Sequence, residues 1–287
     1  MNKTIEGMYQ RRQTWIEETK SLGFNLFGLL TDAYVDESHF VFELLQNAED
    51  VGAVHCQIEL REDCLVFVHN ATRLFDLADI EGITSIGSST KKAEVNKIGR
   101  FGVGIKSIFS LCDKFEIHSG GFHVCVQDFV VPHPLEGDFE NSTRFVLWFK
   151  NPSAFDVIAR RLKNLPEHLL LALNNIKILD VKISPNINVK RVCAERENGV
   201  VRVVTEKGEA HYLVFSEDDQ ALPCKVIYKL AKDMSKIEGV HVNKLLVFFE
   251  TDKNLNLNFY VHAPFQTTPS RDTVHWARSS TRKFLQG

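Results

Sequence analysis

The sequence lacks the features that mark several common classes of protein. No apolar signal core stands near the N-terminus, and no stretch of the 287 residues approaches the roughly 20 apolar residues that a membrane-spanning helix needs. The six cysteines form no CxxC pair and no cysteine–histidine cluster at zinc spacing. We therefore expect buried free thiols in a cytoplasmic protein that has no membrane partner.

An excess of charge of one sign is also lacking. The chain has 34 Lys and Arg against 37 Asp and Glu, for a formal net charge of −3, so it has no global electrostatic reason to attract nucleic acid. There is no internal repeat, low-complexity tract or long Gly/Ser linker. With 44% hydrophobic residues the chain can bury a large core, and its length leads us to expect two domains.

Helical and strand patterns alternate in the first half of the chain. Residues 38–50 carry apolar side chains at helical spacing, with Ser38 as a plausible N-cap and Gly52 after the end. Residues 54–60 and 64–68 predict two antiparallel strands, and residues 114–129 a hairpin that turns at Ser119–Gly121. Residues 142–149 predict a further strand. The first domain, residues 1–150, is thus expected to be α+β.

Asn151, Pro152 and Ser153 interrupt this pattern. A helix is predicted from about Ala154 to Leu173, followed by short strands separated by Gly, Asn and Asp. We expect a second α+β domain over residues 151–287, which continues in a longer protein if this chain is a fragment.

Three polar residues follow one line on the predicted helix of residues 38–50. Glu43, Asn47 and Asp50 stand at positions i, i+4 and i+7, within an arc of roughly 60° on a helix. Their oxygens suit magnesium, which keeps several waters, and a carboxylate beside the metal can orient a water. The same spacing also fits the solvated face of a surface helix.

A glycine-rich run, I-G-R-F-G-V-G-I-K-S-I-F, spans residues 98–109. Gly99, Gly102 and Gly104 precede a helical pattern, and glycines before a helix N-terminus bring backbone N–H groups close to an anion. Arg100 and Lys106 would add positive charge, or are surface residues. The run is no P-loop, because GxxxxGK[ST] is absent. A tight structural turn is the alternative.

The order of the motifs resembles that of a known superfamily. E-L-L-Q-N-A-E-D at 43–50 is followed by two predicted strands, S-I-G-S-S-T-K at 85–91 and I-G-R-F-G-V-G at 98–104. This order and spacing resembles the GHKL ATPases, which include gyrase, histidine kinases and MutL, and looks closest to the chaperone-like branch with sacsin-type and MORC-like ATPases. The resemblance implies a Bergerat α/β sandwich, with helices on one face of a mixed sheet, followed by a transducer-like or middle-like domain.

The resemblance also implies roles for individual residues. Glu43 would polarise the water that attacks the γ-phosphate of ATP, Asn47 would bind Mg²⁺, and Asp50 would hold the polar network near the phosphates. Residues Ile83 to Gly99 match a mobile lid. The residues expected to reach the nucleotide from the lid and the phosphate loop are Ser88, Ser89, Thr90, Lys91, Gly99, Arg100, Phe101, Gly102, Val103, Gly104 and Lys106.

The sequence departs from the family pattern at the adenine end. The family's D-x-G-x-G should follow the strand of residues 64–68, but the chain reads His69-Asn70-Ala71-Thr72-Arg73. His69 or Asn70 is expected to bond the base, or else to be an ordinary turn residue. In the second domain, Arg271 is the candidate for a basic residue that reaches the γ-phosphate, and Gln266 is a second candidate for contact with it. The alternative is that Arg271 is a surface arginine.

Together these features predict an ATPase with Mg²⁺ as cofactor and slow turnover. Its lid closure and domain reorientation would serve a chaperone-like or remodelling protein with an unknown protein client. The N-terminal segment through about Leu30 would exchange between protomers of an ATP-dependent homodimer, or pack within its own chain. The alternative function is a non-hydrolysing nucleotide-binding scaffold or interaction module. A histidine kinase core is disfavoured, because no phosphoacceptor helix precedes the motifs.

Overall fold

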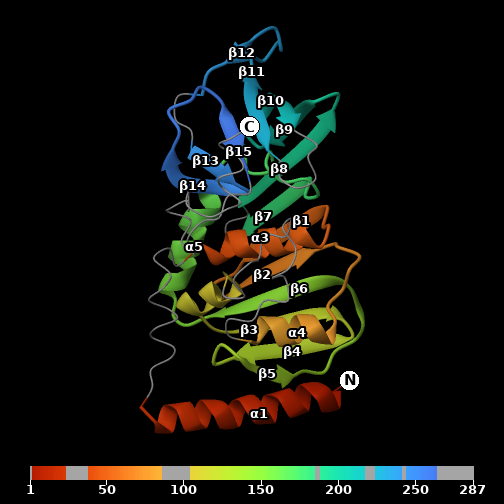
Figure 1. The fold of residues 1–287 in the computed structure, drawn as a ribbon, viewed down its shortest axis with the longest axis vertical. Coiled ribbons are helices and arrows are strands. Elements are labelled where there is room, and N and C mark those ends of the chain that lie inside the picture. Colours follow the sequence, from red (N-terminus) through yellow and green to blue (C-terminus); the bar gives the residue numbers. More distant parts are fainter. Residues whose placement is uncertain are drawn as a thin grey trace, which may run out of the picture. The chain divides into compact units, whose positions relative to one another are not determined.

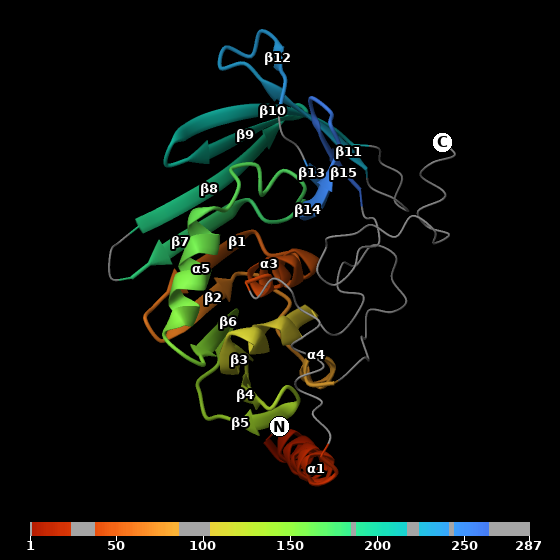
Figure 2. The ribbon, with the colours of Figure 1, turned by 90° about the vertical axis from the view of Figure 1, so that its left-hand side faces the viewer.

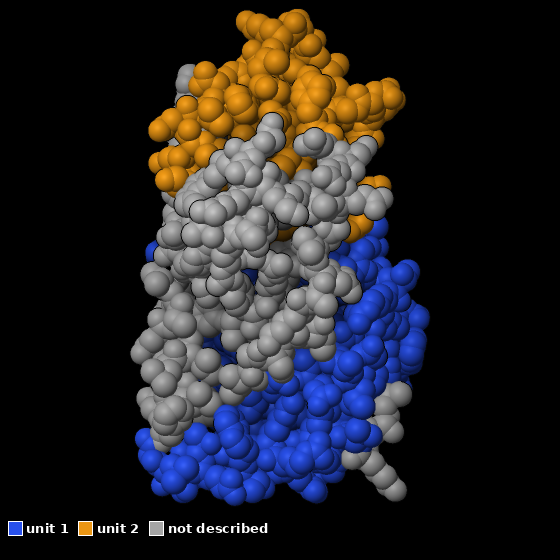
Figure 3. Space-filling model, in the orientation of Figure 1, with its two compact units in different colours: residues 1–164, 180–189 blue, residues 165–179, 190–287 orange. Residues whose placement is uncertain are grey.

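A computed structural model describes residues 2–23, 38–85, 104–184, 188–216, 224–240 and 244–263 (Figure 1). The chain divides into two compact units, which Figure 3 colours separately. Unit 1 comprises residues 1–164 and 180–189, and unit 2 comprises residues 165–179 and 190–287. The sequence pattern predicted a boundary between the two domains at residue 150. No helix within the described ranges is long and apolar enough to cross a membrane.

The sheet of unit 1 combines hairpins with strand pairs that are distant in the sequence. Its strand order is β7-β1-β2-β6-β3-β4-β5, and the pairs β1–β2, β2–β6, β6–β3, β3–β4 and β4–β5 are antiparallel. The predicted strand pair of residues 54–68 and the turn at Gly120–Gly121 are confirmed. The strands are β1 (His55–Leu60), β2 (Cys64–His69), β3 (Cys112–Gly120), β4 (Phe122–Gln127), β5 (Val131–Pro134), β6 (Glu140–Phe149) and β7 (Ile178–Ile183).

Alternation along these strands decides which face of the sheet carries the core of unit 1. In β1, Cys56, Ile58 and Leu60 are buried, and the residues between them are more exposed. Successive side chains of a strand point to opposite faces of the sheet, so the three buried residues share one face. The buried face packs against α3 (Phe40–Asp50) and the 3-10 helix η1 (Gly104–Ser110). Phe109 of η1 lies 5.5 Å from the ring of Phe115 on β3, and so joins helix and sheet.

Three further helices lie in the described part of unit 1. They are α1 (Asn2–Ser21), α4 (Leu77–Ile83) and α5 (Ser153–Lys163). Helix α1 packs along β5, the edge strand, as Figures 1 and 2 show. The ring of Tyr9 packs there against that of His133, with centroids 4.7 Å apart and the planes tilted by 52°. Helix α1, within the described part of the N-terminal segment, therefore packs within its own chain, and exchange between protomers stays a prediction.

Two local predictions were wrong. Ser38 does not cap α3: the helix begins after His39 without a side-chain cap, and the Ser38 hydroxyl instead accepts a hydrogen bond from Arg161 of α5 at 2.9 Å. Helix α5 ends at Lys163 rather than near Leu173, because Pro166 disfavours helix at the residue before it. The helical pattern predicted after Gly102 is confirmed, in the form of a 3-10 helix over residues 104–110.

Unit 2 is a mixed sheet. Its strand order is β14-β13-β15-β11-β10-β9-β8, with β12 on β11; β13 and β15 are parallel, and the other registered pairs are antiparallel. Asn198 and Gly199 both have positive φ and form the two-residue β8–β9 turn, a pairing that suits a type I′ hairpin. The strands are β8 (Asn188–Glu197), β9 (Val200–Thr205), β10 (Gly208–Ser216), β11 (Lys225–Leu230), β12 (Ile237–Glu238), β13 (Lys244–Val247), β14 (Phe249–Asn254) and β15 (Tyr260–His262).

A buried cation fixes the irregular segment after α5 onto unit 2. The Lys225 ammonium is 5% exposed and donates to the carbonyls of Ala172 at 2.9 Å and Leu173 at 3.3 Å, and to Asn174 Oδ1 at 2.7 Å. Arg196 donates to the carbonyls of Leu170 and Leu173. These acceptors lie outside regular secondary structure, so the two side chains satisfy groups that have no ladder partner.

Replacement of Lys225 by Met is therefore expected to lower the free energy of unfolding by about 2–3 kcal/mol, because it leaves buried acceptors without a donor. Urea denaturation followed by circular dichroism measures the change. Lys229→Met, on the same strand with a 40% exposed side chain, is the control and is expected to stay within about 0.5 kcal/mol of wild type. Equal stability of the two variants would contradict this account.

Candidate functional site

Helix α3 is buried on every side but one. Among residues 40–50, all of which the structure describes, only Glu43, Asn47 and Asp50 keep intermediate exposure, and even Gln46 and Glu49 are buried. A surface helix would present a broad solvated face. The predicted line of polar residues is instead a narrow strip on a helix that is otherwise enclosed.

The carboxylate of Glu43 lies directly against Gly104, the first residue of η1. A Cβ built on Gly104 would stand 2.2 Å from Glu43 Oε2 and 2.8 Å from Cδ, closer than any side chain tolerates. The overlapping atoms are the end of a flexible side chain, so a Cβ at position 104 would displace the Glu43 carboxylate from where it lies. The structure thus brings the acidic helix and the end of the glycine-rich run together.

A histidine that the sequence analysis missed stands beside this carboxylate. His39 Nε2 lies 3.4 Å from Glu43 Oε1, and the two side chains are 7% and 14% exposed. The distance suits an ion pair when the imidazole is protonated, although the atoms are not aligned as a hydrogen bond. The i, i+4 spacing of His39 and Glu43 on one helix was the available signal.

Arg161 of α5 holds the start of α3. Its Nε donates to Ser38 Oγ at 2.9 Å, and its guanidinium carbon lies 5.4 Å from the centre of the Phe42 ring, within cation–π range. The residues on either side of His39 are therefore anchored. This positions His39 and Glu43 relative to the sheet.

Lys106, predicted to lie near phosphates, is buried within unit 1. It is 1% exposed, and its ammonium donates to the carbonyls of Ile83, the last residue of α4, and Phe129, in the turn before β5. Burial lowers the pKa of Lys106 to about 7, and the nearby charge of Arg12 contributes. In this structure Lys106 joins the end of α4 to the β4–β5 turn.

Arg12 of α1 also joins the end of α4 to the β4–β5 turn, through the carbonyls that follow those bound by Lys106. Its guanidinium donates to the carbonyl of Thr84 and, at 2.9 Å, to that of Val130. Burial is the main cause that lowers the pKa of Arg12. Two cations thus bind consecutive carbonyls at the base of the segment that was predicted to be a lid.

His69 and Asn70 end strand β2. His69 is 3% exposed, and burial lowers its pKa to about 4, so its imidazole is neutral near pH 7. Asn70 Oδ1 accepts from the backbone N–H groups of Val54 at 3.0 Å and His55 at 2.9 Å. Asn70 therefore has the local role of a turn residue at the start of β1; base recognition by either residue stays a prediction.

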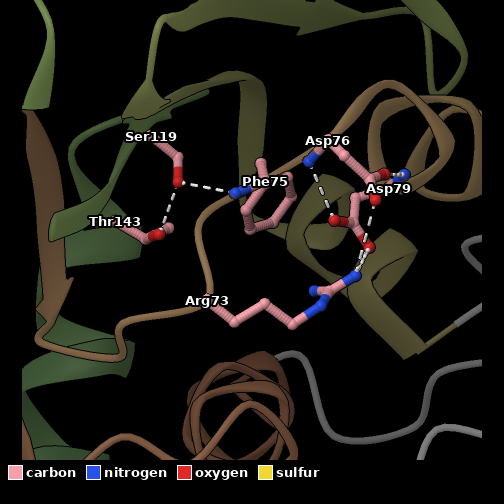
Figure 4. A network of polar contacts seen from close by, with 6 residues as sticks. All are labelled: Arg73, Phe75, Asp76, Asp79, Ser119 and Thr143. Carbon is pink, nitrogen blue, oxygen red and sulfur yellow. Dashed lines mark hydrogen bonds and ion pairs between the residues drawn. The ribbon is translucent and has the colours of Figure 1, made fainter. Parts of the chain in front are cut away.

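A capping box starts α4 just after these residues (Figure 4). Asp76 Oδ1 accepts from the Asp79 N–H at 2.9 Å, and Asp79 Oδ2 accepts from the Asp76 N–H at 3.0 Å. Arg73 donates to Asp79 Oδ1 at 2.9 Å. The sequence D-L-A-D at 76–79 carried this signal.

The loop before α4 is also fastened to the sheet (Figure 4). The Phe75 N–H donates to Ser119 Oγ at 3.0 Å, and Ser119 Oγ lies 2.7 Å from Thr143 Oγ1, with both hydroxyl residues fully buried. Thr143 is the β6 partner of His69. The buried hydroxyl pair therefore fixes the route from the end of β2 to the start of α4.

The remaining predicted site residues lie outside the described residues. They are Ser88, Ser89, Thr90, Lys91, Gly99, Arg100, Phe101, Gly102, Val103, Gln266 and Arg271. Within the described part, Glu43 and Gly104 are in contact, Asn47 and Asp50 continue the line along α3, and Lys106 follows on η1. The oxygen donors on α3 are of the type that Mg²⁺ prefers, so this donor set fits a magnesium ion.

The buried state of Lys106 gives stability a dependence on pH. Its pKa of about 7 is below the unfolded value of 10.5, so between these values the unfolded chain binds more protons. The stability of wild type relative to Lys106→Met should therefore rise with pH from about 7 to about 10, by up to about 1.4 kcal/mol per unit. Denaturant unfolding at several pH values tests this. A pH-independent difference would contradict it, and Lys182→Met controls for the loss of a charge.

Comparison with known proteins points to one family. Residues 57–143 match the family model of the Sacsin domain. The chain is 37% identical over 110 residues to Protein NO VEIN of Arabidopsis thaliana, covering 36% of this chain and 4% of that protein. It is 30% identical over 103 residues to Sacsin of Homo sapiens, covering 29% of this chain and 2% of that protein, so it spans a small part of each relative. The matched family model and the two relatives support a sacsin-like family for this chain.

Proposed function

We propose that this chain is a GHKL (Bergerat-type) module that binds ATP with Mg²⁺ and hydrolyses it slowly. The observation that carries the proposal is the contact between Glu43 and Gly104. It unites the candidate base with the end of the glycine-rich run, which are two halves of one site in the superfamily that the sequence resembles. The α+β organisation, with α3 and η1 on one face of a sheet, is compatible with it.

Glu43 has the surroundings that a catalytic carboxylate needs. It is mostly enclosed, at 14% side-chain exposure, and the nearby His39 and the bare Cα of Gly104 restrict where its oxygens can lie. A fixed carboxylate in a partly dry site orients a water better than a mobile surface group does. Glu43 would hold the water that attacks the γ-phosphate, and would accept its proton.

Asn47 and Asp50 lie next along the same strip of α3. Asn47 would offer its amide oxygen to Mg²⁺, and Asp50 would hold the polar groups around it, with waters completing the coordination. Bound Mg²⁺ neutralises charge on the phosphates. The main-chain N–H groups at the start of η1 complete the phosphate end of the proposed site.

Residues Ile83 to Gly99 would act as a lid, whose closure would reorient the second unit in a chaperone-like or remodelling protein. The carbonyls of Ile83 and Thr84 are held by Lys106 and Arg12. A lid needs a fixed base if binding at its tip is to be coupled to the rest of the domain. The two buried cations would supply that base.

A non-hydrolysing nucleotide-binding scaffold is the second candidate. His69 and Asn70 stand where the family has an acidic residue and glycines, and Asn70 Oδ1 is occupied by two backbone N–H groups. Tight binding of ATP by calorimetry, without phosphate release by wild type, would favour this candidate.

Glu43→Gln is expected to lower the steady-state ATPase rate by about 100-fold or more, because it removes the proton acceptor but keeps the shape of the side chain. Phosphate release measures the rate, and calorimetry checks that ATP still binds. Glu62→Gln, in the exposed turn between β1 and β2, is the matched control and should leave the rate unchanged. An unaltered rate in folded Glu43→Gln would rule out the catalytic role.

Gly104→Ala is expected to lower kcat by about 100-fold, since the added methyl group overlaps Glu43 Oε2 and must displace the carboxylate. Gly7→Ala is the control, because a Cβ at Gly7 on α1 meets only the end of Arg11 at 3.8 Å. Thermal melting of both variants separates loss of activity from loss of fold. Full activity of Gly104→Ala would show that the Glu43 position is not critical.

A further inference from the structure

A second group of polar side chains lies on the other face of the sheet of unit 1. His118 on β3 and His123 on β4 are direct cross-strand partners, and Glu140 begins β6 opposite Gly120. Their neighbours Phe115, Ile117 and Val124 point into the core, so period-2 alternation places the histidines on the face away from η1. One ligand atom of each of the three residues lies within 4.8 Å of the others.

The two imidazoles face each other at close range. His118 Nδ1 and His123 Nδ1 are 2.9 Å apart, and the residues are only 9% and 6% exposed. Among the described residues His123 Nε2 has no hydrogen-bond partner. The ring of His123 is therefore buried with one of its two nitrogens unpaired within the described residues, which is an unusual arrangement for a polar side chain.

A carboxylate fixes the orientation of His118. Its Nε2 lies 3.2 Å from Glu116 Oε2, and Glu116 Oε1 accepts from Trp148 Nε1 at 2.9 Å. When Nε2 carries the hydrogen and donates it to Glu116, Nδ1 of His118 presents a lone pair to His123 and Glu140. Histidines that bind metals are held in this way, with the second nitrogen on a carboxylate.

The loop before β6 closes over His123. A Cβ at Gly137 would lie 2.6 Å from His123 Nδ1, so only glycine allows the loop to approach the ring. The Leu135 N–H donates to the carbonyl of His123 at 2.7 Å and holds the loop there. Glu140, with 25% side-chain exposure, lies on the open side and is oriented by Arg144 at 2.5 Å.

We propose that His118, His123 and Glu140 form a binding site for one Zn²⁺ ion. Two imidazole nitrogens and one carboxylate are a ligand set of zinc, whereas Mg²⁺ and Ca²⁺ prefer oxygen alone. Ligand atoms around a tetrahedral zinc lie about 3.4 Å apart, so a small opening of the histidine pair and a small approach of Glu140 would suffice. Water takes the fourth position, and His123 carries its single hydrogen on Nε2 when Nδ1 binds the ion.

Calorimetric titration of the tag-free chain with ZnCl₂, after removal of metals with a chelator, tests the proposal. One ion should bind per chain, and Co²⁺ in its place should give the visible absorption of a tetrahedral site. His118→Asn, His123→Gln and Glu140→Gln should each weaken binding by at least about 100-fold, and Glu116→Gln by about 10-fold. His55→Gln is the control. His55 Nε2 lies 2.7 Å from Asp180 Oδ2, but among the described residues His55 belongs to no group of three possible ligands, so binding should be unchanged.

Two outcomes would overturn the proposal. The first is the absence of stoichiometric zinc binding, which would leave the histidines as a hydrogen-bonded pair. The second is binding that survives in both histidine variants, which would assign the ion to the free cysteines instead. Circular dichroism checks the fold of each variant. Because the side chain of Glu140 is partly exposed, Glu140→Gln should fold, and its zinc affinity still tests the proposal if a histidine variant does not fold.

Discussion

The contact between the carboxylate of Glu43 and the bare Cα of Gly104 is the constraint on which the candidate site depends. No other residue type at position 104 leaves room for the carboxylate where it lies. The contact in turn requires that α3 and η1 pack closely, which the burial of Phe40, Leu44, Ile108 and Phe109 provides. Hydrophobic packing thus places two polar motifs side by side, and leaves only a narrow strip of α3 for chemistry.

In both units, buried Lys and Arg side chains donate hydrogen bonds to backbone carbonyls that have no partner in a helix or sheet. Segments without regular structure carry carbonyls that have no partner in a ladder, and such groups are costly to bury. Lys106 and Arg12 satisfy them at the end of α4 and before β5, and Lys225 and Arg196 do so in the segment after α5. In unit 1 the same bonds fix the beginning of the segment that we propose as a lid.

Much of the fold could be predicted from the sequence, because local patterns specified it. The alternation in residues 54–68 and the two glycines at 120 and 121 predicted strands and a hairpin that the structure confirms. The end of α5 was misjudged, since the apolar residues 169–173 continue a helical pattern that Pro166 interrupts. The cap at Ser38 was misjudged because its hydroxyl bonds Arg161, which lies more than a hundred residues away.

The candidate site was harder to predict where tertiary contacts decide it. The line of Glu43, Asn47 and Asp50 follows from helical spacing, but its enclosure follows only from packing. Lys106 was predicted to add charge near the phosphates because it follows the glycine-rich run, but its burial depends on tertiary contacts that its neighbours in sequence do not reveal. The pairing of His118 with His123 could have been predicted from the sequence, because a two-residue turn at Gly120–Gly121 places positions 118 and 123 opposite each other.

The central claim is that the oxygens of α3 and the end of the glycine-rich run bind a magnesium nucleotide. Calorimetric titration of the chain with a non-hydrolysable ATP analogue, with and without Mg²⁺ and in Asn47→Ala, tests it most directly. The account predicts one site per chain, whose affinity depends on Mg²⁺ and falls in Asn47→Ala. Absence of binding, or binding that is indifferent to both Mg²⁺ and Asn47, would contradict it.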